Sequence, residues 1–226
     1  MNQELTDLFD DLEQPERRLG AIEELARRVS LTVTVGVDAE ARKPGMEARS
    51  RWLEEFSDGQ YLDDPDRMVR AMTLGLWDLM RAQEKVRDEV LSLLKDSDRM
   101  VRSTAVFAAV RFQEVDPDSQ DVIRRGLSAE DLGERYASAF FLAMRRDESD
   151  RVGVAKALLE GAAEASTLKE SLKGCPFLDD GIPDITAVAL SKLGPVPGVD
   201  TRGFIETMRD EADEEHHWWF DELLQR

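Results

Sequence analysis

Apolar residues recur along this chain at the spacing of one helix face, and the pattern returns at a fixed distance. A stripe at positions i, i+4, i+7 and i+11 runs from Val69 to Met80 and again from Val101 to Phe112, as in an amphipathic helix. Each stripe overlaps a nearly identical heptapeptide, DPDRMVR at 64–70 and DSDRMVR at 96–102. The copies are 32 residues apart (64 to 96), and such a period is typical of stacked repeats.

A second helix is predicted between the copies. The segment 84–96, EKVRDEVLSLLKD, has its apolar residues on one helical face. Val90, Val122 and Val154 also follow one another at 32 residues. Fainter copies are found in the segments 8–29, 118–147 and 177–194. The sequence therefore predicts an all-α protein of about five helical hairpins, in a single repeat domain over residues 1–226.

Two segments interrupt the period. Residues 31–50, LTVTVGVDAEARKPGMEARS, combine a Thr-Val alternation with Pro44-Gly45, which predicts an irregular insert with a short strand and a turn. Inserts of this kind tend to lie on a working face. Residues of about 201–225 are predicted to form one long helix, with His216 partly buried in its apolar stripe. That helix is expected to cap the open end of the stack.

Charge restricts the class of partner. The formal net charge is -18, from 48 acidic and 30 basic residues, so nucleic acid or an anionic membrane would be repelled. A basic protein partner fits, although adaptation to a high-salt habitat explains the acidity equally well. Cys175 is the single cysteine, which rules out an intrachain disulfide. Without a signal peptide or an apolar span, cytoplasmic residence is expected. The oligomeric state stays open.

Few residues suggest site chemistry. The run Glu214-Glu215-His216-His217 gives two acid-to-His spacings of the kind used in di-iron bundles, Asp213 to His216 and Glu214 to His217. Such bundles need further ligands from other helices, and the chain has no other histidine. No phosphate loop or nucleophile motif is present. We therefore predict no catalytic, cofactor or metal site, and no enzyme activity.

Two groups of residues are candidate partner contacts. The first is a local excess of positive charge in the insert, where ordinary pairing with neighbouring acids is the alternative. The second is on the terminal helix, where Trp218 and Trp219 must point in different directions, so that one of them is available for a contact. The candidates are Arg42, Lys43, Arg49, Arg51, His217 and Trp218.

The two heptapeptides resemble the HEAT-repeat family and, more loosely, its armadillo relatives. The family pattern places an Asp in the turn between paired helices, then an apolar residue and an Arg at the start of the second helix. It is matched by Asp64, Val69 and Arg70 and again by Asp96, Val101 and Arg102. Asp11 with Arg17 keeps the same separation. The resemblance covers most of residues 1–194 and implies a right-handed α-α superhelix, or solenoid.

These repeat positions are expected to be structural. An Asp in the turn can cap the following helix, and an Arg can donate to turn carbonyls or to the Asp of an adjacent unit. The HEAT resemblance implies a protein-binding scaffold or adaptor. Alternatives are a cofactor-attachment helper resembling the phycobilin lyase proteins and a HEAT-like DNA glycosylase using Trp52 or Trp77 with Asp78, against which the net charge argues.

Overall fold

The computed structural model describes residues 3–33, 38–56, 59–173 and 181–225. Their regular secondary structure is helical, apart from one isolated antiparallel bridge between Val196 and Val199. The all-α prediction is therefore confirmed. The described residues form two compact units, one up to Glu114 and one from Val115 onward. The expectation of a single domain over 1–226 stays a prediction.

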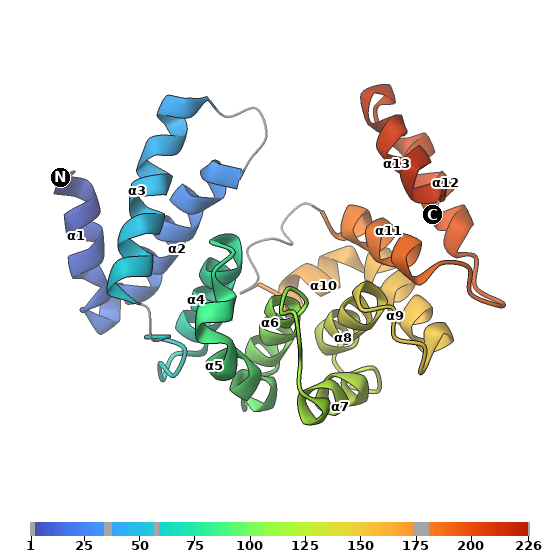
Figure 1. Cartoon of the computed structure of the whole chain (residues 1–226), viewed down its shortest axis with the longest axis horizontal. Helices are drawn as coiled ribbons and strands as arrows, with labels where there is room; N and C mark the ends of the chain where they lie inside the picture. Colours follow the sequence, from blue (N-terminus) through green and yellow to red (C-terminus); the bar gives the residue numbers. More distant parts are fainter. Residues whose placement is uncertain (1–2, 34–37, 57–58, 174–180, 226) are drawn as a thin grey trace. The chain divides into compact units, whose positions relative to one another are not determined.

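The first unit contains two layers of helices (Figure 1). In one layer α2, α4 and α6 pack side by side in chain order, and α1, α3, α5 and η2 pack against members of this layer. The 3-10 turns η1 and η2 flank α5. The bounds are α1 Gln3–Leu12, α2 Pro15–Val33, α3 Ala39–Glu55, α4 Arg67–Leu79, η1 Gln83–Val86, α5 Arg87–Ser92, η2 Leu93–Lys95 and α6 Arg99–Ala109.

The predicted irregular insert at 31–50 is wrong for most of its length. Its first residues end α2, its second half is the start of α3, and residues 34–37 lie outside the described part. Pro44-Gly45 lies inside α3 instead of forming a turn. A Cβ on Gly45 would lie 2.1 Å from the carbonyl oxygen of Arg28. Glycine is therefore present here because α3 approaches the backbone of α2 closely, which local sequence does not reveal.

Aromatic side chains fill the core of the first unit. The indole of Trp52 lies 4.7 Å from the ring of Phe56 and 6.2 Å from Trp77. Arg18 covers the ring of Tyr61 at 4.7 Å, and Tyr61 donates a 3.1 Å hydrogen bond to Glu13. Stacked and edge-on rings of this kind stabilise beyond the area they bury. The core thus joins α2, α3, α4 and the turn at Tyr61.

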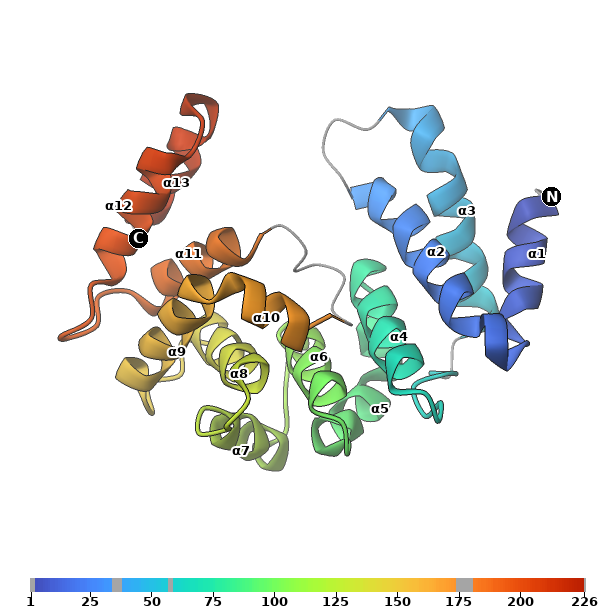
Figure 2. The same cartoon turned by 180° about the vertical axis from the view of Figure 1, so that it is seen from behind.

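The second unit is also built from paired helices. α8 and α9 pack together, α11 lies against both of them, and α10 packs on the same pair on the side seen in Figure 2. α12 and α13 pack against each other and against α11. The bounds are α7 Pro117–Gly126, α8 Leu132–Met144, α9 Arg151–Ala163, α10 Ala165–Ser171, α11 Ile182–Leu193, α12 Thr201–Glu211, η3 Glu214–His216 and α13 His217–Leu224.

The terminal segment is a hairpin, so the prediction of one long helix is wrong. α12 ends at Glu211, Ala212 is extended (φ -79°, ψ 157°), and the chain restarts in η3 and α13. Acidic residues are unfavourable at a helix C-terminus and favourable at an N-terminus, so the acidic run after Arg209 favours a break at this place. Ile205 of α12 and Phe220 and Leu223 of α13 are buried.

Candidate functional site

The repeated turns are held by pairs of aspartates. Asp66 caps α4 by accepting a 2.8 Å hydrogen bond from Met68 N–H, and Asp98 caps α6 from Met100 N–H at 2.9 Å. Two residues earlier, Asp64 accepts from Asp66 N–H at 2.8 Å and Asp96 from Asp98 N–H at 2.7 Å. In each turn one Asp caps the helix, and the other fixes the loop that precedes the cap.

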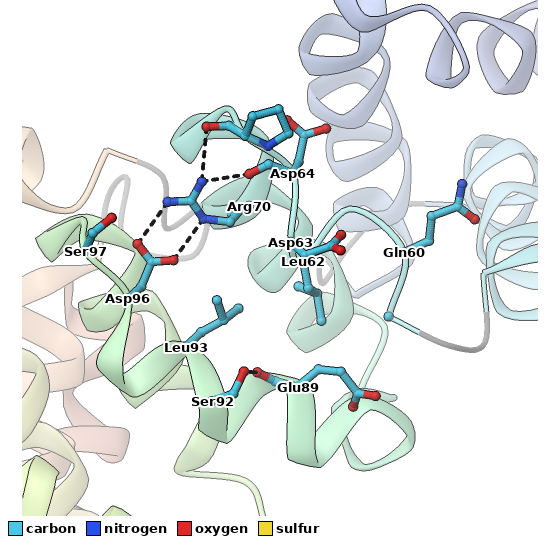
Figure 3. A pocket seen from close by; sticks show the side chains of 12 residues that line it. Gln60, Leu62, Asp63, Asp64, Arg70, Glu89, Ser92, Leu93, Asp96 and Ser97 are labelled. Carbon is cyan, nitrogen blue, oxygen red and sulfur yellow. Dashed lines mark hydrogen bonds and ion pairs between the residues drawn. The ribbon is translucent and has the colours of Figure 1, made fainter.

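An arginine in each copy holds its own turn, and Arg70 also joins that turn to the next. Arg70 donates from Nη1 to the carbonyl of Asp64 at 2.7 Å, and from Nε and Nη2 to the carboxylate of Asp96 at 2.9 Å each (Figure 3). Arg102 likewise donates to the carbonyls of Asp96 at 2.7 Å and Ser97 at 3.0 Å. The sequence predicts that an Arg reaches turn carbonyls or the Asp of an adjacent unit, and Arg70 does both.

The corresponding arginine in the first hairpin is Arg18. Its Nε donates to the carbonyl of Leu12 at 2.7 Å, six residues earlier, and its Nη1 donates to the carboxylate of Asp64. Arg17, which the letter spacing favours, makes an exposed ion pair with Asp11. The backbone carbonyl six residues before the arginine can belong to any residue type, here Leu12. The Asp-to-Arg spacing therefore points to Arg17 instead of Arg18.

The hairpin that contains Arg135 keeps the arginine without the aspartate six residues earlier. Arg135 donates to the carbonyls of Ala129 at 2.9 Å and Glu130 at 2.7 Å, and to the carboxylate of Glu160 at 2.6 Å. Asp131 caps α8 through Glu134 N–H. The backbone contacts are therefore common to Arg18, Arg70, Arg102 and Arg135. The carboxylate differs from copy to copy: it is Asp64 for Arg18, Asp96 for Arg70 and Glu160 for Arg135.

A cleft of about 740 Å³ lies beside the two aspartate turns. We call it the acidic groove (Figure 3). Four of its lining residues are carboxylates and one is an arginine, and the rest are polar or apolar. It is lined by Gly59, Gln60, Leu62, Asp63, Asp64, Pro65, Arg70, Glu89, Ser92, Leu93, Asp96 and Ser97.

The four carboxylates of the acidic groove differ in their availability. Asp64 and Asp96 are engaged by Arg18 and Arg70, with side chains only 5% and 9% exposed. Asp63 and Glu89 are exposed, and no salt bridge involving either is found among the described residues. The groove therefore has a fixed, charge-paired wall and two accessible acids. Local sequence does not distinguish these two acids from the many others in so acidic a chain.

The basic residues predicted as partner contacts are mostly engaged within the first unit. Arg49 donates to the carbonyl of Met80 at 3.0 and 3.3 Å. Arg51 covers the ring of Phe9 at 4.2 Å and donates to Glu55 at 2.6 Å. Lys43 is exposed and pairs with Glu40 at 2.7 Å. Arg42 is half-buried.

Two of these residues line a second, shallow groove. Lys43 and Arg51 lie there with three glutamates and the exposed Met46, in a cleft of about 770 Å³. Arg42 and Arg49 do not line it. Three carboxylates against two cations leave no net positive charge, so the arrangement does not favour an anion. The full lining is Leu5, Lys43, Pro44, Met46, Glu47, Ser50, Arg51, Glu54 and Glu55.

Comparison of the chain with protein-family models, with curated proteins and with solved structures finds no match. Within the described part of the chain, none of the helices is long and apolar enough to cross a membrane. The site must therefore be interpreted from its own geometry.

The terminal hairpin presents its residues differently from the sequence prediction. Trp218 is 65% exposed, which suits a contact residue. His217 is half-buried and donates from Nε2 to the carbonyl of Ala212 at 3.1 Å. His216, expected to be partly buried, is exposed because the chain turns in η3. Burial raises the pKa of Asp184 in α11, and the charge of His216 acts in the opposite direction.

The residues considered for base recognition lie inside the first unit. Trp52 and Trp77 have no exposed surface, and Asp78 is buried. Burial raises the pKa of Asp78, although its 2.7 Å ion pair with Arg111 opposes the shift. Rings that pack in the core are not presented for stacking on an extruded base.

Proposed function

We propose that this protein is a non-catalytic protein-binding scaffold, whose acidic groove holds a basic segment of a partner protein. The supporting observation is the acidic groove itself, in which Asp63 and Glu89 are exposed beside the rigid Arg70–Asp96 pair. We further propose that the repeats form a right-handed α-α superhelix of the HEAT type. The layer α2, α4 and α6 and the repeated arginine contacts support this.

The chemistry of the groove suits lysine or arginine side chains. Leu62 and Leu93 lie between the Arg70–Asp96 pair and Glu89 (Figure 3), and they can pack against the apolar stem of a long basic side chain. Its charged end can then reach Asp63 or Glu89, where a charge-assisted hydrogen bond is stronger than a neutral one. Arg18 keeps the carboxylate of Asp64 in place and Arg70 that of Asp96, so little ordering is required on binding.

The charge of the whole chain supports the same partner class. A formal net charge of -18 attracts a basic segment over distances comparable with the Debye length and accelerates association. The proposal therefore predicts binding that weakens steeply as salt rises. Binding to a neutral segment with no salt dependence would contradict it.

The test uses fluorescently labelled peptides in which Lys or Arg alternates with Leu, together with peptides of the same length in which Gln replaces the basic residues. Anisotropy at low and at physiological salt measures affinity for the full chain. The Asp63→Asn/Glu89→Gln variant is expected to weaken binding by about tenfold or more. The matched control, Glu47→Gln/Glu54→Gln, makes the same change of charge in the second groove.

Equal weakening by the two double variants would show that net charge alone attracts the peptide, and would overturn the assignment to the acidic groove. Affinity capture from the native lysate, followed by mass spectrometry, then identifies the natural partner. A groove partner is retained by the control variant and lost from the Asp63→Asn/Glu89→Gln variant.

A further inference from the structure

We propose that Asp213, Glu215 and His216 form a binding site for a divalent transition-metal ion, at the corner between α12 and α13. One ligand atom from each residue lies within 4.8 Å of the other two. Metal–nitrogen and metal–oxygen bonds of about 2.0–2.2 Å hold neighbouring ligand atoms about 3–4 Å apart. Small side-chain rotations are therefore enough to bring all three atoms onto one ion.

The local backbone explains why the three side chains converge. Asp213 precedes the single 3-10 turn of η3, and its carbonyl accepts a 2.8 Å hydrogen bond from His216 N–H. In a 3-10 turn, residues three apart lie almost directly above one another. This places Asp213 over His216, and Glu215 is adjacent in the same turn. The break that separates α12 from α13 thus creates the cluster.

The donor set indicates which class of ion would bind. One imidazole with two carboxylates suits Zn²⁺ and similar ions such as Ni²⁺ or Co²⁺, whereas Mg²⁺ and Ca²⁺ prefer oxygen ligands alone. All three residues are exposed, so water completes the coordination and the ion can exchange. Asp184 of α11 interacts electrostatically with His216 and adds negative charge beside the site.

His217 is not one of the proposed ligands, because its side chain already makes a hydrogen bond. His217 donates from Nε2 to the carbonyl of Ala212 at 3.1 Å and is half-buried. Glu214 also lies beside the cluster without belonging to it. Each of two ligands therefore has an adjacent residue of the same type as a matched control, which makes the assignment testable residue by residue.

The experiment titrates the untagged full-length chain with Zn²⁺ alone, followed by calorimetry, and repeats it with Mg²⁺. The proposal predicts one Zn²⁺ per chain, displaced poorly by excess Mg²⁺. His216→Ala and Glu215→Gln are expected to weaken Zn²⁺ binding by about tenfold or more, a loss of about 1.4 kcal/mol. His217→Ala and Glu214→Gln are expected to retain it.

A second readout is independent of these substitutions. The chain has only two histidines, so their ring protons can be followed separately by nuclear magnetic resonance. Zn²⁺ is expected to shift the signals of His216 strongly and those of His217 weakly. Three results would overturn the proposal. They are a failure of the chain to bind Zn²⁺, equal Zn²⁺ affinity of wild type and His216→Ala, and a loss of affinity in His217→Ala equal to that in His216→Ala. Because the site lies in the other unit, none of these outcomes bears on the acidic groove.

Discussion

Arg70 fixes the distance between two successive turns, because its guanidinium donates two 2.9 Å hydrogen bonds to the carboxylate of Asp96 and one of 2.7 Å to the carbonyl of Asp64. The side chains of Arg70 and Asp96 are only 12% and 9% exposed. A pair so well buried is costly to break, since removal of one partner leaves the other charge desolvated and uncompensated.

Asp96→Ala is accordingly expected to lower the free energy of unfolding by about 3 kcal/mol, measured by urea denaturation. The control is Asp121→Ala, because Asp121 is 61% exposed and pairs with Arg124 at the surface. Exposed pairs contribute about 0–1 kcal/mol. A similar loss in both variants would show that the Arg70–Asp96 pair has no special role.

Arg102→Ala is expected to lower thermal stability without changing peptide affinity of the folded fraction. The variant loses a part-buried hydrogen bond to the carbonyl of Asp96 and an exposed one to the carbonyl of Ser97, and a hydrogen bond contributes about 0.5–1.5 kcal/mol. Thermal denaturation and the anisotropy assay measure the two effects separately. Intact stability with lost binding would assign Arg102 to the binding site instead of to the fold.

Gly161→Ala is expected to destabilise the second unit by about 1–3 kcal/mol, because overpacking outweighs the better helix propensity of alanine. A Cβ on Gly161 would lie 2.2 Å from the ring of Tyr136, whose hydroxyl is hydrogen-bonded to Thr186 at 2.7 Å. Gly20 of α2 has no atom within 4 Å of that position. Gly20→Ala should therefore raise the free energy of unfolding by about 0.5–1 kcal/mol. Chemical denaturation that shows a loss of stability for Gly161→Ala and a gain for Gly20→Ala would support both predictions.

The two tyrosines are expected to stay protonated in the folded protein at pH 10, the ordinary pKa of the side chain. Burial, aided by the contact with Glu13, raises the pKa of Tyr61 to about 12. Burial also raises the pKa of Tyr136, against the opposing effect of Thr186. Ultraviolet titration should show phenolate at pH 10 only after unfolding. Phenolate in the folded protein at that pH would contradict the packing of both rings.

The same shifts determine how stability depends on pH. The unfolded chain releases its phenol protons near pH 10, whereas folded Tyr61 retains its proton up to about 12. Between these values the folded state binds more protons, so the free energy of unfolding falls as pH rises. Tyr61→Phe should flatten this part of the profile. An unchanged slope would assign alkaline unfolding to other groups.

Local pattern was sufficient for the helices and insufficient for two of their boundaries. The stripes beginning at Val69 and Val101 predict α4 and α6, and both helices bury the stripe together with most of the residues between its members. Pro44-Gly45 predicts a turn but lies inside α3, since the close approach of Gly45 to the Arg28 carbonyl involves residues that are distant in sequence. The apolar stripe continues past Glu211 and so predicts one helix. The break depends instead on the acidic run, which is unfavourable at the C-terminus of a helix.

The candidate sites were harder to predict than the helices. Asp63 and Glu89 face one groove only after the turns and α5 are packed, and neither is distinguished by its neighbours in sequence. The sequence predicts a partly buried His216 and a contact role for His217, whereas His216 is exposed and His217 is half-buried, because the chain turns in η3 between Asp213 and His217. The acidic groove and the histidine cluster both depend on where a turn places a side chain.

The contact made by Arg70 also has a direction, because a repeat supplies the arginine and the following turn supplies the carboxylate. A duplicated block of 32 residues (64 to 96) therefore brings one new donor and one new acceptor, and the gene can grow by whole blocks without creating an unmatched charge. Arg18 reaches Asp64 across 46 residues, whereas Arg70 reaches Asp96 across 26. An additional helix, α3, is thus accommodated between partners without loss of the pairing. Such an array can lengthen or acquire helices during evolution while an arginine–aspartate pair still joins one turn to the next.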